Sequence, residues 1–446
     1  MKTILHIDFN SYFATVEQQA NPRLRGKPIG VTGGDRDSRT VVGAASIEAK
    51  ARGVKTGMSL PEALKLCPEL ILVRGDSEKY LECTKRFLNI LKDYSPNLEV
   101  FSIDEVFLEL PSDGSGSCRS GISGASSLVT TSLRSTPETS HSAPPLALLN
   151  IALEIKNKIR KEVGEWISCS IGISYNKVMA KFAGSLFKPN GLAIIADEEA
   201  AMKVLDQVDL DEICGIGFRV KKRLNNLGIF SFAQLRKVPL ASLLAAFKSY
   251  GQFLYDISRG INYSPITPFY EKAEVKSIGH RHTLSHDTND EIEIKQTLLK
   301  LTELVARRLR AKKLAGKTVS CWYRSAFDLN YFKLTGNKFK SDGMQVTISL
   351  IQDGLEIFNR AWKIFQTVWQ KESIRMIGVS ISNLKPENPK NLTFLEDKLR
   401  QEKIIQALDN INDRYGEFTL QRAILISSER IYRKPNPFLA DRRFNI

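Results

Sequence analysis

Hydrophobic and polar positions in the N-terminal part of the chain follow the short periods of strands and helices. Residues 2–9 form an apolar run that ends in Asp8, which is typical of a buried strand with a carboxylate at its end. A helix is predicted to follow over residues 11–19. Two further strands are predicted around a turn-rich segment, at residues 27–31 and 40–46. The pattern indicates a small mixed α and β unit.

The next part of the chain predicts helices and then a hairpin. Two short helical stretches lie within residues 47–66, and a stronger helix is predicted over residues 77–93, with Ser77 as its N-cap. Residues 98–110 alternate in polarity and are rich in β-branched side chains. This favours two strands that are hinged at residues 102–105.

Periodicity is lost over residues 111–145, where Ser, Thr, Gly and Pro dominate and large apolar residues are few. This composition predicts a flexible insertion. An amphipathic helix over residues 148–164, a strand over residues 166–174 and a Lys-rich helix from Asn176 are predicted after it. The insertion is therefore expected to interrupt one domain rather than to separate two.

The C-terminal half changes from helical to mixed character. Residues 200–262 are predicted to be all helical. Over residues 272–384 the predicted order is strand, helix, strand, strand, helix, strand, which indicates a small α+β module with a split β-α-β character. The tail, residues 385–446, begins with a polar stretch and contains a predicted helix near residues 396–413.

Length and composition describe a modular globular protein. The 446 residues suggest about three or four compact units, and 42% hydrophobic with 25% charged residues excludes a disordered or fibrous class. The 64 Lys and Arg outnumber the 49 Asp and Glu, giving a net charge of +15. This charge fits a partner that carries many phosphates, such as nucleic acid. A merely basic protein without such a partner is the alternative.

Cysteine spacing and hydropathy predict the compartment. The six cysteines are scattered, without the spacing of a zinc site or a disulfide framework. No stretch approaches the roughly 20 apolar residues that span a bilayer, and Asp8 makes the N-terminal apolar run too short for a signal peptide. We therefore expect a cytoplasmic protein that is neither exported nor embedded in a membrane.

Three carboxylates lie where the predicted strands end or turn. Asp8 ends the first strand, and Asp104 and Glu105 lie in the hinge of the hairpin. Oxygen ligands of this kind suit Mg²⁺, and two such ions stabilise the attacking and leaving oxygens of a phosphoryl displacement. Acids at strand ends are also common without any metal, so solvated side chains are the alternative.

Four segments of the chain, in their order and approximate spacing, resemble those of Y-family DNA polymerases of the DinB, or polymerase IV, type. They are HIDFNSYFATVE (6–17), FSIDEVFLEL (101–110), ISYNKVMAKFAGSLFKPNG (173–191) and CGIGFRVKKRLNNLGI (214–229). The resemblance extends over residues 2–384 and is weaker beyond them.

The resemblance implies an α+β fold with the right-hand architecture of a polymerase. The domains that it implies are a palm at 1–10 and 78–188, which contains the insertion 111–145, fingers at 11–77, a helical thumb with a helix-hairpin-helix at 189–262, a little finger at 272–384 and a C-terminal tail at 385–446.

The implied activity is low-fidelity, template-directed DNA synthesis past damaged bases, by a monomer that binds primer-template DNA and dNTPs. Two Mg²⁺ ions are implied as cofactors. A catalytically silent relative that recruits partners to DNA is the first alternative, and the presence of all three carboxylates argues against it. The second alternative is a helix-hairpin-helix DNA-binding protein with a structural metal.

The resemblance also assigns roles at the predicted metal site. Asp8 and Asp104 match the carboxylates that bridge both ions, and Glu105 matches the ligand of the ion at the primer 3′-hydroxyl. Phe9 matches the residue whose backbone carbonyl binds the ion on the nucleotide side.

Nucleotide contacts are implied for neighbouring residues. Phe13 matches the steric gate that excludes a 2′-hydroxyl, with Tyr12 beside it, and Lys181 matches a lysine that contacts the triphosphate. A core aromatic residue on an amphipathic helix is the alternative for Phe13. The segment 188–191 is interpreted as the turn between palm and thumb.

One segment departs from the family pattern. Ala44 and Ile47 replace a hydroxyl and a phenol that bind the triphosphate, and Lys50 replaces an arginine. A lysine keeps the charge but cannot form the bidentate guanidinium fork. Either nucleotide binding is weaker, or a neighbour compensates, with three candidates: Arg39, Arg52 and Lys55.

The segment 214–229 has the form of a helix-hairpin-helix. Gly215 and Gly217 would turn backbone N–H groups toward a DNA phosphate, and Lys221 and Lys222 follow them. The basic run at 306–313 is expected to add phosphate contacts, although such runs are more often solvated helix faces.

Two further signals are weak. His280, His282 and His286 lie close together, but no acidic or Cys partner is spaced to complete a metal site, so none is predicted. Residues 391–397 (NLTFLED) resemble the short peptide that docks such polymerases on the sliding clamp, without its leading Gln. Clamp binding is therefore only a possible partner interaction.

Overall fold

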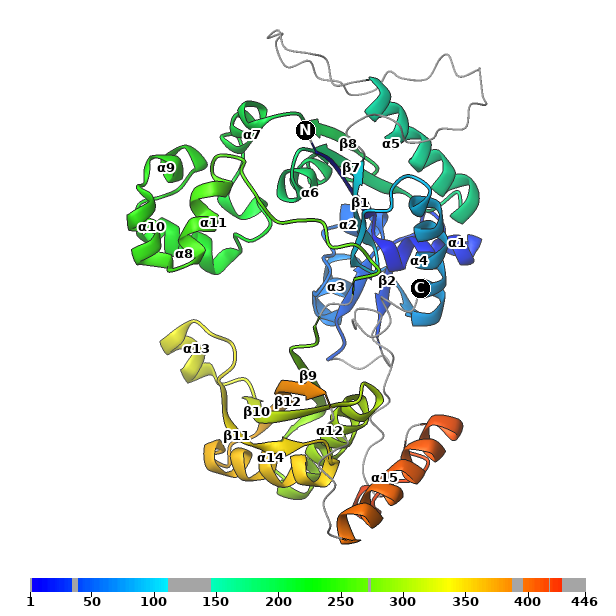
Figure 1. Ribbon diagram of the computed structural model, residues 1–446, viewed down its shortest axis with the longest axis vertical. Helices are drawn as coiled ribbons and strands as arrows, with labels where there is room; N and C mark the ends of the chain where they lie inside the picture. The colour runs from blue at the N-terminus through cyan, green and yellow to red at the C-terminus, as the bar shows by residue number, and fades with distance from the viewer. Residues whose placement is uncertain are drawn as a thin grey trace. The chain divides into compact units, whose positions relative to one another are not determined.

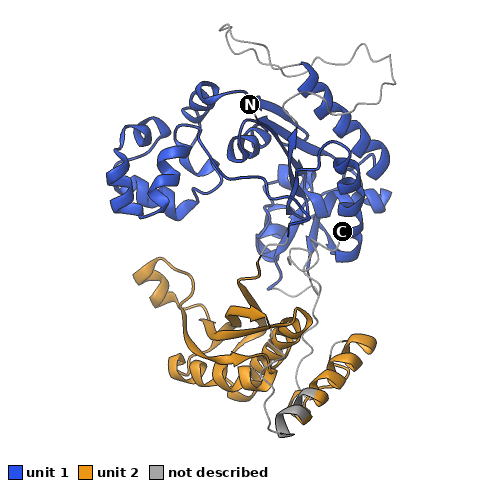
Figure 2. Cartoon of the chain, in the orientation of Figure 1, with its two compact units in different colours: residues 1–272, 434–446 blue, residues 273–433 orange. Residues whose placement is uncertain are grey.

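The computed structural model describes residues 2–33, 39–110, 146–271, 274–386, 396–416 and 418–426. The predicted insertion 111–145 lies outside the described residues. The chain forms two compact units, built on residues 1–272 and 273–433 (Figure 2). Among the described residues, no helix combines the length and the apolar character needed to cross a membrane.

The centre of the first unit is a five-stranded sheet (Figure 1). Its strand order is β5 (Leu98–Ser102), β6 (Glu105–Leu110), β1 (Thr3–Phe9), β7 (Cys169–Ser174) and β8 (Leu192–Ile195). The central strand β1 is antiparallel to both of its neighbours, and β8 is parallel to β7. The strand β8, which the sequence pattern did not predict, extends this sheet beyond the turn at 188–191.

Helices cover both faces of this sheet. On one face, Leu5, Ile7 and Phe9 join a core with α1 (Tyr12–Ala20), α4 (Ser77–Lys92) and α5 (Leu146–Lys158). On the other face lies α6 (Lys177–Leu186), which packs on Ile4 and Phe107. The side chains of β1 therefore alternate between two closed environments.

The close approach of α6 to the sheet depends on a glycine in β7. A Cβ atom at Gly172 would collide with the backbone of Ala180 and Gly184 in α6. The helix therefore rests directly on the strand. His6 of β1 also faces α6, and it is only 1% exposed.

The first residue of α4 was predicted to be its N-cap, and this prediction is wrong by one position. Asp76 is the N-cap, and its side chain accepts hydrogen bonds from the backbone N–H groups of Glu78 and Lys79. Ser77 is the first helical residue. Both residue types cap helices well, so the sequence does not separate them.

Along the chain, a smaller sheet and two short helices lie between α1 and α4. The strand order is β3 (Val42–Ala45), β2 (Ile29–Thr32) and β4 (Ile71–Arg74), where β4 was not predicted. The predicted helical stretches are α2 (Ile47–Ala51) and α3 (Leu60–Leu66). Thus α2 begins directly after β3.

The remainder of the first unit is helical, as predicted. Its helices pack around an apolar core that they share with Met179, Phe182 and Ala183 of α6. They are α7 (Glu198–Leu205), α8 (Phe218–Asn226), α9 (Phe232–Lys237), α10 (Leu240–Phe247) and α11 (Tyr250–Ile257).

The second unit contains a four-stranded antiparallel sheet in the order β11 (Ser341–Ile351), β10 (Leu314–Ser325), β12 (Ile374–Pro386) and β9 (Ser277–Thr288). The buried face carries Val319, Cys321 and Tyr323 and packs on α12 (Glu291–Ala311) and α14 (Gly354–Val368). The predicted element order is confirmed, with the short helix α13 (Leu329–Thr335) as an addition between β10 and β11.

The predicted tail helix is α15 (Glu396–Tyr415), and it packs against α12. Arg310 of α12 forms a bidentate pair with Asp409 at 2.6 and 2.7 Å, and Arg307 pairs with Asp413. Two arginines of the basic run at 306–313, predicted to contact phosphate, are therefore engaged by acidic residues of α15.

Candidate active site

Strand register brings the three predicted carboxylates to one end of the five-stranded sheet. Asp8, the penultimate residue of β1, lies opposite Glu105, the first residue of β6. Asp104 lies in the tight turn between β5 and β6, and its carbonyl oxygen accepts a hydrogen bond from the backbone N–H of Phe9 at 3.0 Å. This bond fixes the turn to the end of β1.

Asp104 is held in an environment that disfavours its charge. Burial raises the pKa of its carboxyl group, and the nearby charges of Asp8 and Glu105 raise it further. Ser102 donates a hydrogen bond to Asp104 at 2.5 Å and opposes this shift. A site that gathers negative charge in this way is favourable for a cation.

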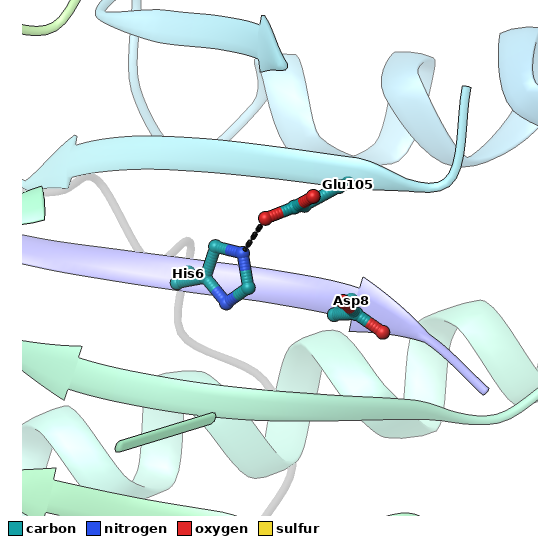
Figure 3. A group of neighbouring side chains, drawn as sticks. All are labelled: His6, Asp8 and Glu105. Atoms are coloured by element: carbon teal, nitrogen blue, oxygen red, sulfur yellow. Dashed lines mark hydrogen bonds and ion pairs between the residues drawn. The ribbon is translucent and has the colours of Figure 1, made fainter. Parts of the chain in front are cut away.

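Glu105 is stabilised in its charged form. Burial alone would raise its pKa, but the hydrogen bond from His6 and the charge of Lys181 outweigh burial, and the net shift is downward. The His6 Nε2 atom lies 2.5 Å from Glu105 Oε1 (Figure 3). Lys181 of α6 pairs with the same oxygen.

A cavity of about 600 Å³ opens beside these carboxylates. Asp8, Phe9 and Asp104 line it from the end of the sheet. The other described lining residues come from the start of α1, from β3, from α2 and the loop after it, and from the turn after α6: Asn10, Ser11, Tyr12, Phe13, Gly43, Ala44, Ile47, Lys50, Ala51, Thr56, Lys188 and Pro189. Acidic, aromatic and basic groups thus face one space.

Two lysines carry positive charge into this cavity. Lys188 Nζ lies 2.8 Å from Asp8 Oδ1. The pKa of Lys50 is lowered, first by burial and then by the charge of Lys188. Ala44 and Ile47 contribute apolar surface to the same cavity. The three neighbours considered as substitutes, Arg39, Arg52 and Lys55, are not among the described lining residues.

The structure separates Lys181 and Lys188, two of the three lysines of the segment 173–191. Lys181, which was expected to contact a triphosphate, pairs with Glu105 and lies over the ring of Phe101. It is not among the described lining residues of the cavity, whereas Lys188 is. From the sequence, Lys188 was predicted only to lie in a turn. Its position directly before Pro189, where the chain leaves α6 for the sheet, was the available signal.

Phe13 and Tyr12 have different environments although they are adjacent. Phe13 is half-buried, lines the cavity and stacks on Tyr80, with ring centroids 4.3 Å apart. Tyr12 is buried, and its hydroxyl donates to the Tyr80 carbonyl oxygen at 2.8 Å and contacts Thr84. Burial and these contacts fix the Tyr12 hydroxyl to α4.

Of the two predicted helix-hairpin-helix glycines, the backbone requires a glycine only at Gly215. Gly215 has a φ of 107°, and a Cβ atom there would lie 2.7 Å from the ring of Phe253. Gly217 is the N-cap of α8. Lys222 is exposed, but Lys221 pairs with two acidic residues, Asp209 and Asp211.

His6 was not singled out from the sequence, yet it belongs to the only group of potential metal ligands within the described residues. Ligand atoms of His6, Asp8 and Glu105 lie within 4.8 Å of one another. The three histidines of β9 form no such group in the described part of the chain. The available signal for His6 was its position two residues before Asp8, on the same face of the strand.

Comparisons with known proteins match both units. The model of the impB/mucB/samB family matches residues 7–185, and that of the impB/mucB/samB family C-terminal domain matches residues 275–394. The chain is 33% identical over 441 residues to the DNA polymerase IV of Pelotomaculum thermopropionicum, covering 97% of each chain. It is 29% identical over 446 residues to DNA polymerase IV 1 of Bacillus subtilis, covering 99% of this chain and 97% of the relative.

Among solved structures, a chimeric Y-family DNA polymerase matches with a TM-score of 0.67 and 24% identity, covering 86% of this chain and 99% of that one. This likeness concerns the fold.

Proposed function

This chain belongs to the Y-family DNA polymerases of the polymerase IV type, and from this premise we propose that Asp8, Asp104 and Glu105 hold two Mg²⁺ ions for nucleotidyl transfer. The activity is template-directed DNA synthesis of the translesion kind. In the reaction, the primer 3′-oxygen attacks the α-phosphorus of a dNTP, and pyrophosphate leaves. The observation that carries the proposal is that Asp8 and Asp104 line one cavity with Phe13, Lys50 and Lys188.

The donor atoms at this site fit hard divalent cations. Asp8 and Asp104 offer carboxylate oxygens at the cavity wall, Glu105 lies opposite Asp8 in strand register, and Phe9 brings its carbonyl to the same edge. Mg²⁺ takes oxygen ligands of this kind and keeps sites open for phosphate oxygens. When bound, such ions activate the attacking oxygen and stabilise the leaving one.

Phe13 is proposed to select the sugar of the incoming nucleotide. Its ring is held by stacking on Tyr80, so it presents a fixed surface to the cavity. A clash with a 2′-hydroxyl rejects ribonucleotides without any hydrogen bond to the deoxy form. Tyr12 contributes by fixing this part of α1 to α4, because its hydroxyl is already bonded there.

Lys188 and Lys50 are proposed to bind the triphosphate. Both line the cavity, and Lys188 contacts Asp8, so phosphate charge would be placed beside the proposed metal ligands. Lys181, assigned to the triphosphate by resemblance, pairs with Glu105 instead and is not among the described residues that line the cavity. Charge from two lysines would partly replace the groups absent at Ala44 and Ile47.

The small residues Gly43 and Ala44 line the cavity, so a nascent base pair there would be loosely covered. This is our proposed basis for tolerance of damaged template bases and for low fidelity.

We also propose the palm, fingers, thumb and little finger boundaries that the resemblance implies, together with a monomeric state, a cytoplasmic location and clamp binding through residues 391–397. The last segment lies mostly outside the described residues.

DNA affinity is proposed to come from other parts of the chain. The backbone at Gly215 and Gly217 and the exposed Lys222 are the proposed phosphate contacts of the helix-hairpin-helix. Lys221 can contribute only by leaving its acidic partners, Asp209 and Asp211. Metal-site variants should therefore retain DNA.

The test is primer extension by Asp104→Asn and Glu105→Gln variants, with DNA binding measured in parallel. We expect extension to fall by at least about a thousandfold, because charge stabilisation at the reacting phosphate is lost, while DNA affinity stays near that of the unaltered chain. Glu99→Gln is the matched control, because Glu99 also pairs with a lysine of α6, Lys177 at 2.8 Å, but does not belong to the group of ligand atoms around Asp8.

Two results would contradict the proposal. One is extension by Asp104→Asn and Glu105→Gln at the rate of the Glu99→Gln control. The other is loss of DNA binding in step with loss of extension, which would indicate a DNA-binding site rather than a catalytic centre.

A further inference from the structure

We propose that His6 is a positioning residue for Glu105: its Nε2–H group holds one carboxylate oxygen and thereby keeps the other available to a divalent ion. The inference rests on the proposed role of Glu105 as a metal ligand. His6 is not one of the three carboxylate residues. Its imidazole is a buried polar group, and core packing alone does not explain its presence.

The first observation is that both donors to Glu105 reach the same oxygen. His6 Nε2 lies 2.5 Å from Oε1, and Lys181 Nζ contacts Oε1 as well. Among the described residues, Oε2 has no hydrogen-bond or ion-pair partner. Figure 3 shows the imidazole beside Oε1, and Asp8 farther toward the end of the strand. The carboxylate is therefore anchored at one oxygen only.

The second observation concerns the other nitrogen of His6. Nδ1 is buried and has no hydrogen-bond partner among the described residues. A Cβ atom at Gly184 of α6 would lie 3.0 Å from Nδ1, and the ring of Phe107 is 4.7 Å from the imidazole. A proton on Nδ1 would be an unpaired buried donor, whereas a proton on Nε2 meets a carboxylate. The fold therefore favours the tautomer that donates to Glu105.

Rigidity distinguishes His6 from Lys181 as an anchor. His6 lies on the central strand and its side chain is 1% exposed, while the long side chain of Lys181 is 26% exposed. Partners that orient ligating carboxylates from behind change metal affinity by about 10- to 100-fold when they are removed. A direct ligand role for His6 is less suitable, because hard cations prefer oxygen ligands.

Two substitutions of similar length separate positioning from packing. His6→Gln keeps an N–H donor, whereas His6→Met keeps the volume without a donor. Burial alone favours Met, since a buried amide without full hydrogen bonding is costly. Positioning favours Gln. If only packing matters, the Met variant should bind Mn²⁺ at least as tightly as the Gln variant. If positioning matters, the Gln variant should bind Mn²⁺ more tightly.

The measurement is Mn²⁺ binding, followed by electron paramagnetic resonance, to the full chain with primer-template DNA and a matching dNTP. The primer ends in a dideoxynucleotide, so no turnover occurs. We expect His6→Met to bind the weaker of two Mn²⁺ ions about tenfold less tightly than His6→Gln, with a thermal midpoint at least as high. His286→Phe is the control for loss of an imidazole, because His286 is exposed and lies in the second unit.

Glu105→Gln is included so that the two proposals can fail separately. If it binds both ions as the unaltered chain does, the proposed role of Glu105 is wrong. If it loses the weaker ion while His6→Met and His6→Gln bind equally, only the His6 inference is overturned. A directly coordinated nitrogen in the pulsed spectrum of the unaltered chain would overturn it too, since His6 would then be a ligand.

Discussion

The two larger sheets of this chain differ in what covers them. In the five-stranded sheet, α6 lies on one face and α1, α4 and α5 on the other, so every residue of β7 is buried. In the four-stranded sheet, α12 and α14 cover one face only. The opposite face of β10 carries Ser320, Trp322 and Arg324, all partly exposed.

The difference indicates how each sheet can serve a polymerase. A closed sheet can hold acidic side chains at its strand ends in fixed positions, because neighbouring elements prevent other arrangements. An open face exposes its side chains to a large partner, but no neighbouring element holds those side chains in fixed positions. We therefore expect chemistry to depend on the first sheet and non-specific affinity on the second.

The same substitution in both sheets tests this contrast most strongly. In Gly172→Ala, the new methyl group meets the α6 backbone, which cannot move without lifting the helix, and we expect a loss of about 3 kcal/mol of stability. In Gly378→Ala, the nearest atoms belong to the Trp322 ring, 2.7 Å away on the open face. That ring can rotate aside, so the cost should be about 1 kcal/mol.

Chemical denaturation of the two variants measures both values. Similar losses would show that the two sheets tolerate volume equally, and would contradict the contrast between closed and open faces.

The next effect concerns Lys181 and Lys188, which lie in the same segment, 173–191. Lys188→Met should raise the KM for dNTP about 10- to 100-fold, because a charged hydrogen bond to phosphate contributes roughly 1.5–3 kcal/mol. Lys181→Met should instead lower kcat with little change in KM, because Lys181 acts on Glu105. Steady-state kinetics with one dNTP decides between them. A large KM effect at Lys181 would restore the role that resemblance gives it.

Local patterns in the sequence were sufficient to predict most elements near the site. The apolar run ending at Asp8 and the hinge at Asp104 and Glu105 are short-range signals, and the structure has β1, β5 and β6 there. Their roles in catalysis stay predictions. The fold class and the family, which rested on the motifs, are confirmed by the comparisons.

Long-range contacts could not be predicted. The Lys188–Asp8 and His6–Glu105 contacts depend on strand register and on how α6 lies on β7, neither of which has a local signature. The pairing of Arg310 with Asp409 likewise joins residues far apart in the chain. The basic run predicted charge on this helix but not the acidic residues of α15 that pair with Arg307 and Arg310, and its phosphate contacts stay a prediction.

Phe13→Ala tests whether the cavity at the end of the closed sheet selects the sugar. As a gate, its removal should raise the ratio of ribo to deoxy kcat/KM by about tenfold or more. As a core residue alone, its removal would lower stability by roughly 3–5 kcal/mol without altering sugar choice. The ratio for one nucleotide, measured beside a melting curve, distinguishes the two. An unchanged ratio in a destabilised chain would refute the gate.

The smallest effect should come from the open face of the second sheet. Arg281 lies opposite Gly378 in register, and Gly378 lies opposite Trp322, so Arg281 and Trp322 share this face. If phosphate contacts are made here, Arg281→Ala should weaken DNA binding a few-fold. The slope of log affinity against log salt should fall by about 1, because one fewer counterion is released.

Arg307→Ala is the matched control for this prediction, because its guanidinium belongs to the basic run but is engaged by Asp413. Its salt slope should equal that of the unaltered chain. Binding titrations over a range of salt concentrations compare the two arginines directly. A reduced slope for Arg307 with none for Arg281 would mean that the α12 side, after release of α15, contacts DNA, and that the open face of the sheet does not.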